Sequence, residues 1–230
     1  GARRTRKDFL KQAAGIPGIY VPSLYEVTYR SDGTVEAIRP VAPEVPARIT
    51  RRWVRKLPPP PVRPVVPFME IIHDRAAIEV QRGCTRGCRF CQAGIVYRPP
   101  RERPLEEVMD AADKILQNTG YGELSLLSLS SSDYSCIEPV VAGLLAGHQK
   151  DRLSVSLPSL RMDSFSIGLA DLLQTGKRTG LTFAPEAGSQ RLRDGINKSA
   201  TEEDLVRAAQ VAFTRGWRGL KLYFMIGLPD

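Results

Sequence analysis

Three cysteines lie close together in the sequence, at positions 84, 88 and 91. Thiolates are soft metal ligands, and gaps of three and then two residues place all three in a single loop. Gly83 and Gly87 stand directly before Cys84 and Cys88, and glycine lets the backbone fold back toward the sulfur atoms at low steric cost. Cys84, Cys88 and Cys91 are therefore predicted to bind a metal centre.

The number of cysteines favours an iron–sulfur cluster with one open position. A structural zinc ion normally takes four protein ligands, and electron-transfer clusters also take four cysteines, at other spacings. The other candidates, Cys136, His73 and His148, show no partner spacing with the loop. Three thiolates alone leave one iron of a [4Fe–4S] cluster open to a small molecule. A zinc loop is the alternative.

The loop follows the first of five expected strands. Periodicity and turn residues predict strands over residues 76–81, 124–129, 153–157, 180–184 and 220–226. Helical spacing predicts helices between them, over 105–116, 140–145, 164–173, 189–196 and 202–213. The second of these helices is expected to begin with a capping box formed by Ser135 and Glu138, and Thr201 is expected to cap the last. Strands joined by helices indicate βαβ units in a parallel sheet, whose functional loops follow the carboxyl ends of the strands.

Residues 1–70 have a different character. They hold most of the prolines, and the run of four prolines at 58–61 predicts a stiff polyproline II connector. Residues 25–29 and 34–38 are β-prone around a central Gly33 and predict a hairpin. This part is expected to be an irregular, partly β-stranded extension without its own core, and residues 71–230 are expected to form the main domain.

Composition narrows the class of protein. The chain is 42% hydrophobic and 25% charged, as globular proteins are. It has no long apolar run, and no secretory signal is expected, because no apolar segment follows the basic residues at its start. Few cysteines, three of them in one loop, favour a reducing, cytoplasmic setting. Residues 1–104 carry 20 of the 33 Lys and Arg and only 9 of the 25 Asp and Glu. This basic part permits a nucleic-acid partner, but its scattered charges favour packing against another domain or an anionic cofactor.

The loop resembles the CxxxCxΦC signature of the radical S-adenosylmethionine (SAM) superfamily, with Phe90 as the aromatic residue Φ. This resemblance covers about residues 70–230. It implies an α/β fold, a partial (βα)6 TIM-like barrel, here truncated after its fifth strand and preceded by the Pro-rich extension. It implies that Cys84, Cys88 and Cys91 bind three irons of a [4Fe–4S] cluster and that SAM binds the fourth. Reductive cleavage of SAM then gives a 5′-deoxyadenosyl radical.

The resemblance also implies residues that bind SAM. Relatives often carry Gly-Gly-Glu after the second strand to hold the SAM amino group, whereas this chain has Ser128–Tyr134, so hydroxyls, carbonyls or Asp133 are expected to accept there. Glu186 takes the position of the carboxylate residue that contacts SAM, Arg161 or Arg191 is implied to pair with the SAM carboxylate, and Arg193 and Lys198 are expected to be solvated. The implied cofactor-binding residues are Phe90, Ser130, Ser132, Ser159, Arg161, Glu186, Arg191 and Gly227.

The chain looks most similar to radical SAM proteins that carry an N-terminal cobalamin-binding-like domain. The resemblance implies hydrogen abstraction or cobalamin-linked methyl transfer on an unknown substrate, with an electron donor such as flavodoxin or ferredoxin. The start without Met and the end after a strand suggest a piece of a longer protein, which lacks the cobalamin-like domain and a C-terminal segment. The alternatives are a methylthiotransferase-like enzyme acting on RNA or ribosomal protein, and a non-catalytic metal-cluster module.

Overall fold

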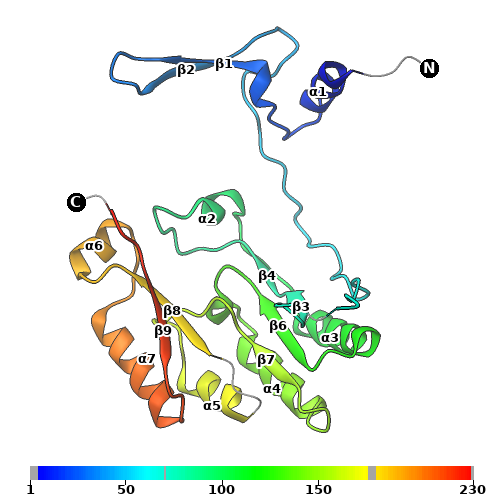
Figure 1. Ribbon diagram of the computed structural model, residues 1–230, viewed down its shortest axis with the longest axis vertical. Coiled ribbons are helices and arrows are strands. Elements are labelled where there is room, and N and C mark those ends of the chain that lie inside the picture. Colours follow the sequence, from blue (N-terminus) through cyan, green and yellow to red (C-terminus); the bar gives the residue numbers. More distant parts are fainter. Residues whose placement is uncertain (1–4, 70, 176–179, 229–230) are drawn as a thin grey trace. The chain divides into compact units, whose positions relative to one another are not determined.

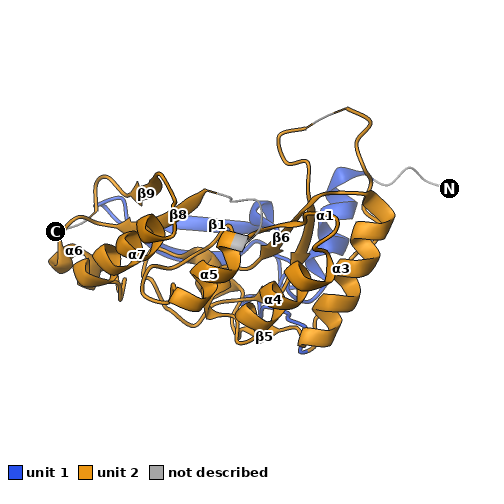
Figure 2. Cartoon of the chain, turned by 90° about the horizontal axis from the view of Figure 1, so that it is seen from below, with its two compact units in different colours: residues 1–55 blue, residues 56–230 orange. Residues whose placement is uncertain are grey.

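The computed structural model describes residues 5–69, 71–175 and 180–228. The chain divides into two compact units, Gly1–Arg55 and Lys56–Asp230, which Figure 2 distinguishes by colour. No helix in the described ranges is long and apolar enough to cross a membrane.

The first unit contains a helix and a hairpin. Helix α1 (Arg6–Ala14) begins with a capping box in which the hydroxyl of Thr5 accepts from the Asp8 N–H at 3.2 Å. After a short 3₁₀ turn η1 (Pro22–Leu24), strands β1 (Tyr25–Tyr29) and β2 (Val35–Pro40) pair antiparallel, which confirms the predicted hairpin. The helix was not predicted, and it helps to bury a small apolar cluster where no core was expected, formed by Ala14, Val21, Leu24 and Val45.

The second unit alternates strands with helices, as predicted (Figure 1). In chain order its elements are β3 (Ala76–Glu79), β4 (Gln81–Arg82), α2 (Gln92–Val96), β5 (Arg101–Glu102), α3 (Leu105–Thr119), β6 (Glu123–Leu127), the 3₁₀ turn η2 (Ser131–Asp133), α4 (Ile137–Gly147), β7 (Ser154–Ser156), α5 (Ile167–Thr175), β8 (Leu181–Glu186), α6 (Gln190–Gly195), α7 (Glu202–Thr214) and β9 (Leu220–Phe224).

Strands β4 and β5 pair antiparallel, and the other strands of this unit pair in parallel, in two separate sheets. One sheet has the order β3-β6-β7, and the other joins β8 to β9. A single five-stranded sheet was expected, and the described residues form neither that sheet nor a closed barrel. Strand β7 ends at Ser156, two residues before Pro158, which has no N–H to donate to a neighbouring strand.

Helices cover one side of these strands. Figure 2 shows α3, α4, α5 and α7 along that side. The buried face of α3 consists of Val108, Ala111, Ala112 and Ile115, close to the predicted helical stripe. These residues pack in one core with Ile78, Leu124, Leu126 and Phe183 of the strands. Apolar side chains therefore fill the space between the helices and the strands, and we look for the functional site at the ends of the strands.

Helix caps test two sequence predictions. Helix α7 begins at Thr201 with the predicted capping, because the Thr201 hydroxyl accepts from the Asp204 N–H at 3.1 Å. The predicted capping box at α4 is wrong. Cys136 is the N-cap and makes no side-chain cap, and Glu138 instead accepts a hydrogen bond from Ser166, which precedes α5. The Glu138 carboxylate therefore makes a tertiary contact instead of capping its own helix.

Candidate active site at the carboxyl ends of the strands

The three cysteines lie in the loop between β4 and α2. All three thiols are free and partly exposed. The sulfur of Cys84 accepts a hydrogen bond from the Arg86 N–H at 3.4 Å, and that of Cys91 accepts one from the Gly94 N–H at 3.2 Å. Cys91 is also the N-cap of α2. Backbone N–H groups that donate to cysteine sulfur are a feature of iron–sulfur sites.

Two glycines shape this loop. Gly83 has a φ of +91°, and a Cβ atom there would lie 2.4 Å from the carbonyl oxygen of Tyr97. Gly87 has a φ of +70°. Both conformations belong to the left-handed region that side chains avoid. The loop therefore closes against the end of α2 in a way that only glycine permits at position 83.

An arginine inside the loop binds carboxylates from two neighbouring strand ends. The guanidinium of Arg86 donates from Nε to Asp133 at 2.8 Å and from Nη2 to the second oxygen of the same carboxylate. Its Nη1 lies 3.5 Å from Asp163. Asp133 follows β6 and Asp163 follows β7, so this ion-pair network joins three loops.

The network continues to Arg161, which donates to both oxygens of Asp163 at 2.9 and 2.7 Å. Burial alone would raise the pKa of Asp163, but its bonds to Arg161 and Ser199 outweigh burial and hold that pKa below the usual range. The pKa of Asp133 is lowered in the same way, with burial opposed by Arg86 and Ser130. The hydrogen bonds to Asp133 raise the pKa of Arg86.

A segment more than a hundred residues away in the sequence packs on the loop from the other side. After α6, the side-chain amide of Asn197 donates to the carbonyl oxygens of Gly87 at 2.9 Å and Arg86 at 3.3 Å. The Arg89 N–H donates to the carbonyl oxygen of Ile196 at 2.9 Å. Ser199 adds a hydrogen bond to Asp163 at 3.0 Å. The cysteine loop is thus held by loops from three βα units.

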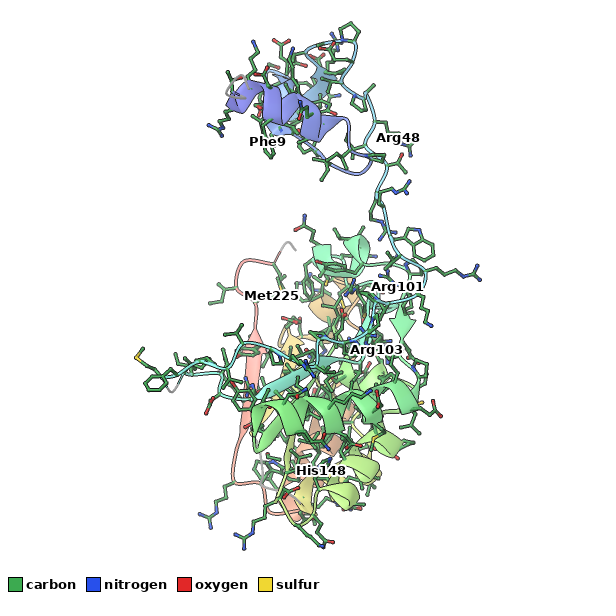
Figure 3. The ribbon with its side chains drawn as sticks, turned by 90° about the vertical axis from the view of Figure 1, so that its right-hand side faces the viewer. Phe9, Arg48, Arg101, Arg103, His148 and Met225 are labelled. Atoms are coloured by element: carbon green, nitrogen blue, oxygen red, sulfur yellow. The ribbon has the colours of Figure 1, made fainter. Side chains whose placement is uncertain are left out.

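A cavity of about 210 Å³ opens beside Cys84. Its lining includes Ser130 and Asp133 from the loop after β6 and Gln81 and Glu102 from β4 and β5. Figure 3 labels Arg101 and Arg103, which flank Glu102 in the sequence, and shows His148 lower in the same unit. This cavity therefore combines a cysteine with polar acceptors at the carboxyl ends of the strands, where parallel sheets hold their ligands.

Glu186 ends β8 in an unusual conformation. Its φ is +69°, and the pairing of β8 with β9 shifts register between Phe183 and Glu186. Its carboxylate lies 3.4 Å from the Lys198 ammonium, and both side chains are largely buried. The expectation that Lys198 is solvated is therefore wrong, because it pairs with Glu186 in the interior.

The second predicted surface residue is also buried. Arg193 is 5% exposed, and it donates to the carbonyl oxygens of Ala187 at 2.9 Å and Gly188 at 3.2 Å. The expectation of a solvated helix face fails because this guanidinium satisfies the carbonyls of the turn between β8 and α6.

The structure brings some of the predicted cofactor-binding residues together. Ser130 donates to Asp133 at 2.6 Å, and the Ser132 hydroxyl accepts from the Arg161 N–H at 3.0 Å. The carbonyl oxygen of Ser159 accepts from the Ser131 N–H at 2.8 Å. The loops after β6 and β7 therefore lie together beside the cysteine loop. Phe90, Arg191 and Gly227 are exposed.

Asp133 was among the acceptors expected for the SAM amino group, but both its oxygens already accept from Arg86.

Other site residues were not predicted from the sequence. Arg86, Asp163 and Asn197 were not singled out. Asp163 offered a usable signal, since it follows a strand end two residues after an arginine, whereas nothing in its spacing connects Asn197 to the cysteines.

The donor set fits an iron–sulfur cluster. Three free thiols share one loop, and two of them receive backbone N–H bonds of the kind that tune such clusters. In the parts of the chain that the structure describes, no three Cys, His, Asp or Glu side chains are arranged as the ligands of a single ion. In a [4Fe–4S] cluster each cysteine binds a different iron, so the three sulfurs need not meet at one point.

Comparison with known proteins identifies the family. Residues 78–230 match the model of the radical SAM superfamily, and the chain belongs to that superfamily. Members of this superfamily bind a [4Fe–4S] cluster and SAM.

Individual relatives show how much of a longer protein the match covers. The chain is 38% identical over 152 residues to an uncharacterised protein of Methanocaldococcus jannaschii, which covers 66% of this chain and 33% of that protein. A threonylcarbamoyladenosine tRNA methylthiotransferase of Treponema pallidum is 26% identical, and the match covers 60% of this chain and 29% of that protein. A ribosomal protein uS12 methylthiotransferase of Pelotomaculum thermopropionicum is 24% identical, and the match covers 67% of this chain and 36% of that protein. The chain thus spans about a third of the length of these relatives.

Solved structures share the fold. The radical SAM methyltransferase TsrM of Kitasatospora setae, solved with cobalamin and a [4Fe–4S] cluster bound, has a TM-score of 0.58 at 16% identity, over 67% of this chain and 31% of that one. The cobalamin-dependent SAM radical enzyme OxsB has a TM-score of 0.51 at 16% identity, and the match covers 65% of this chain and 23% of that one. At this identity, the likeness establishes the α/β fold alone.

Proposed function

We propose that Cys84, Cys88 and Cys91 each bind one iron of a [4Fe–4S] cluster and that SAM binds the remaining iron from the cavity beside Cys84. The observation that carries this proposal is the shared lining of that cavity, in which a cysteine, Ser130 and Asp133 meet. When bound, the cluster supplies the electron that cleaves SAM to methionine and a 5′-deoxyadenosyl radical.

The other residues implied by the signature are proposed to surround SAM. Ser130, Ser132 and Ser159 offer hydroxyls and carbonyls in the loops beside the cavity, while Arg161 and Arg191 are the candidates for the SAM carboxylate. For Arg161 this role competes with Asp163, which already engages two of its nitrogens. Phe90, Glu186 and Gly227 complete the set, by resemblance to the family's motif.

For the reaction, we propose hydrogen abstraction or cobalamin-linked methyl transfer on an unknown substrate. The shared fold with TsrM and OxsB supports the second, and cobalamin would then come from an N-terminal domain outside this sequence. The radical SAM units are proposed to belong to a partial (βα)6 barrel, and an electron donor such as flavodoxin or ferredoxin is the proposed partner.

A second candidate is a methylthiotransferase-like enzyme. Two relatives with that activity align over 60% and 67% of this chain. The excess of Lys and Arg in residues 1–104 suits an RNA substrate.

Anaerobic reconstitution with iron and sulfide tests the ligand assignment. The wild-type protein is expected to bind about four irons per chain, with broad charge-transfer absorbance that Cys84→Ala, Cys88→Ala and Cys91→Ala each abolish. Cys136→Ala is the matched control, because Cys136 lies outside the loop at the N-terminus of α4, and it should keep the cluster. Loss of the cluster in Cys136→Ala would replace the open-iron site with a closed four-cysteine site, and one zinc without sulfide would contradict the cluster altogether.

Product analysis separates the two reactions. Hydrogen abstraction converts SAM to methionine and 5′-deoxyadenosine, whereas transfer of its methyl group leaves S-adenosylhomocysteine. Incubation of the reduced, reconstituted protein with SAM, with and without cobalamin, should show which product forms, by liquid chromatography. Methylthiotransferase activity predicts a dependence on added RNA or ribosomal protein instead of cobalamin.

A further inference from the structure

Gln81 carries a buried polar atom without a partner. Its side chain is 6% exposed, and its Oε1 makes no hydrogen bond. A buried carbonyl oxygen left unpaired costs about 1–3 kcal/mol, and such a group in a native protein requires an explanation. A bound ligand that donates to this oxygen would supply one.

The orientation of the Gln81 amide is fixed by its neighbour. Gln81 lies opposite Glu102 in the β4–β5 pair, and its Nε2 donates to the Glu102 carboxylate at 3.3 Å. A carboxylate only accepts, so the nitrogen must be the atom that faces it. Glu102 is itself held by the Ser135 N–H at 3.1 Å. The amide oxygen is therefore the group that remains for another donor.

Gln81 lines the cavity beside Cys84, together with Glu102, Ser130 and Asp133. Two of these four residues have acceptors that are already engaged: Asp133 accepts from Arg86 and Ser130, and Glu102 accepts from Gln81 and Ser135. The Ser130 hydroxyl donates its proton to Asp133. The Gln81 oxygen is thus a preformed, buried acceptor on the lining of this cavity.

We propose that the Oε1 of Gln81 accepts a hydrogen bond from an N–H of the SAM amino group. This inference rests on the proposed placement of SAM in the cavity. It assigns to the strand before the cysteines a further acceptor for the amino group, beside the hydroxyls and carbonyls of Ser128–Tyr134, which stand where relatives often carry Gly-Gly-Glu. Glu102 is then a positioning residue, which holds the amide with its oxygen toward the ligand.

The test compares SAM with an analogue in which hydrogen replaces the amino group. Gln81→Met keeps the length and burial of the side chain but removes the acceptor. It should weaken SAM binding to the reconstituted protein roughly tenfold to hundredfold, the effect of losing a hydrogen bond to a charged group. Its affinity for the deaminated analogue, measured by calorimetry or by competition, should stay at the wild-type value, because that analogue has no amino group to lose.

Gln117→Met is the matched control. It makes the same chemical change on α3, beside the pocket that contains His148, and it should leave both affinities unchanged. Iron content and thermal unfolding of each variant show whether it is folded and loaded. Equal affinities of wild type and Gln81→Met for SAM, or equal weakening for SAM and the analogue, would overturn the proposal. A wild-type protein that binds the cluster but no SAM would instead contradict the proposed function.

Discussion

Glu186 and Lys198 form an ion pair inside the protein, at the end of a strand that opens toward the site. The carboxylate belongs to a residue in the left-handed region, where a side chain costs about 1–2 kcal/mol. Strain of this kind persists only where the surrounding structure compensates for it, and it concentrates at functional sites. Here the compensation includes the Met225 N–H, which donates to the Glu186 carbonyl oxygen at 2.8 Å. The residue therefore joins β8, β9 and the segment after α6.

Glu186→Gln is expected to lower the free energy of unfolding by about 1–3 kcal/mol, because it leaves the Lys198 ammonium buried without a counter-charge. Adding Lys198→Met should recover most of that loss, and chemical denaturation of the two single variants and the double variant measures the coupling. Arg207→Gln, on the exposed face of α7, is the control. If the losses of stability in the two single variants simply add up in the double variant, the interaction between Glu186 and Lys198 does not stabilise the protein.

The same carboxylate is a proposed SAM contact, which a binding measurement tests independently. Glu186→Gln should keep its iron and weaken SAM binding roughly tenfold to hundredfold. Arg207→Gln, on the exposed face of α7, is again the control and should leave SAM binding unchanged. Unchanged SAM affinity in Glu186→Gln would confine the residue to a structural role.

At the scale of elements, the cysteine loop is one of four loops that bind one another through charge and backbone contacts. Arg86 reaches the loops after β6 and β7, and Asn197 reaches back from the segment after α6. Bidentate guanidinium–carboxylate pairs fix direction as well as distance. The loop therefore depends on its neighbours for its shape more than on its own few hydrogen bonds.

Arg86→Gln is expected to reduce the iron retained after reconstitution and to speed the decay of the cluster absorbance. It leaves the carboxylates of Asp133 and Asp163 close together without the cation between them, and like charges repel. Arg82→Gln is the matched control, since Arg82 lies beside the same loop but pairs with Glu79 three residues away. Similar iron loss in both variants would show that loop charge alone, and not the bond between loops, holds the cluster.

These elements show what the sequence could and could not predict. The helical spacing of α3 and the N-cap at Thr201 are local patterns, and both predictions were confirmed. The prediction of a capping box at Ser135 was wrong, because Glu138 accepts a hydrogen bond from Ser166, which directly precedes α5. Likewise, Lys198 looked like a surface residue because its partner lies twelve residues away with no helical period. Local chemistry could be predicted, whereas contacts between loops leave no spacing in the sequence.

At the scale of the whole molecule, ionised carboxylates hold the second unit together. Asp133 and Asp163 both have pKa values below their usual range in the folded protein. Groups of this kind stabilise the fold when they are charged, because unfolding exposes them to water, where their pKa is about 3.9. Their contribution is therefore fully present above about pH 4 and disappears as the pH falls through the lowered folded values.

Asp163→Asn should change this pH dependence. The variant is expected to be less stable than wild type at pH 7, because Arg161 loses its partner in a site where it is 9% exposed. It should also lose less stability than wild type between pH 5 and pH 2, since one titrating carboxylate is gone. Thermal unfolding of both cluster-free proteins, followed by circular dichroism between pH 2 and pH 7, measures these two effects. If stability depends on pH in the same way in wild type and variant, Asp163 does not stabilise the fold through its charge.

The bond from Asn197 to the carbonyl oxygen of Gly87 spans 110 residues, and this separation sets an order of events during synthesis. A ribosome adds about 5–20 residues per second, so roughly 5 to 20 seconds pass between the making of the cysteine loop and the making of Asn197. During that interval the three thiols have emerged without the segment that closes over them. In the cell, cluster delivery to the finished loop must follow the translation of α6, and until then the nascent cysteines are exposed to oxidants and to competing metals.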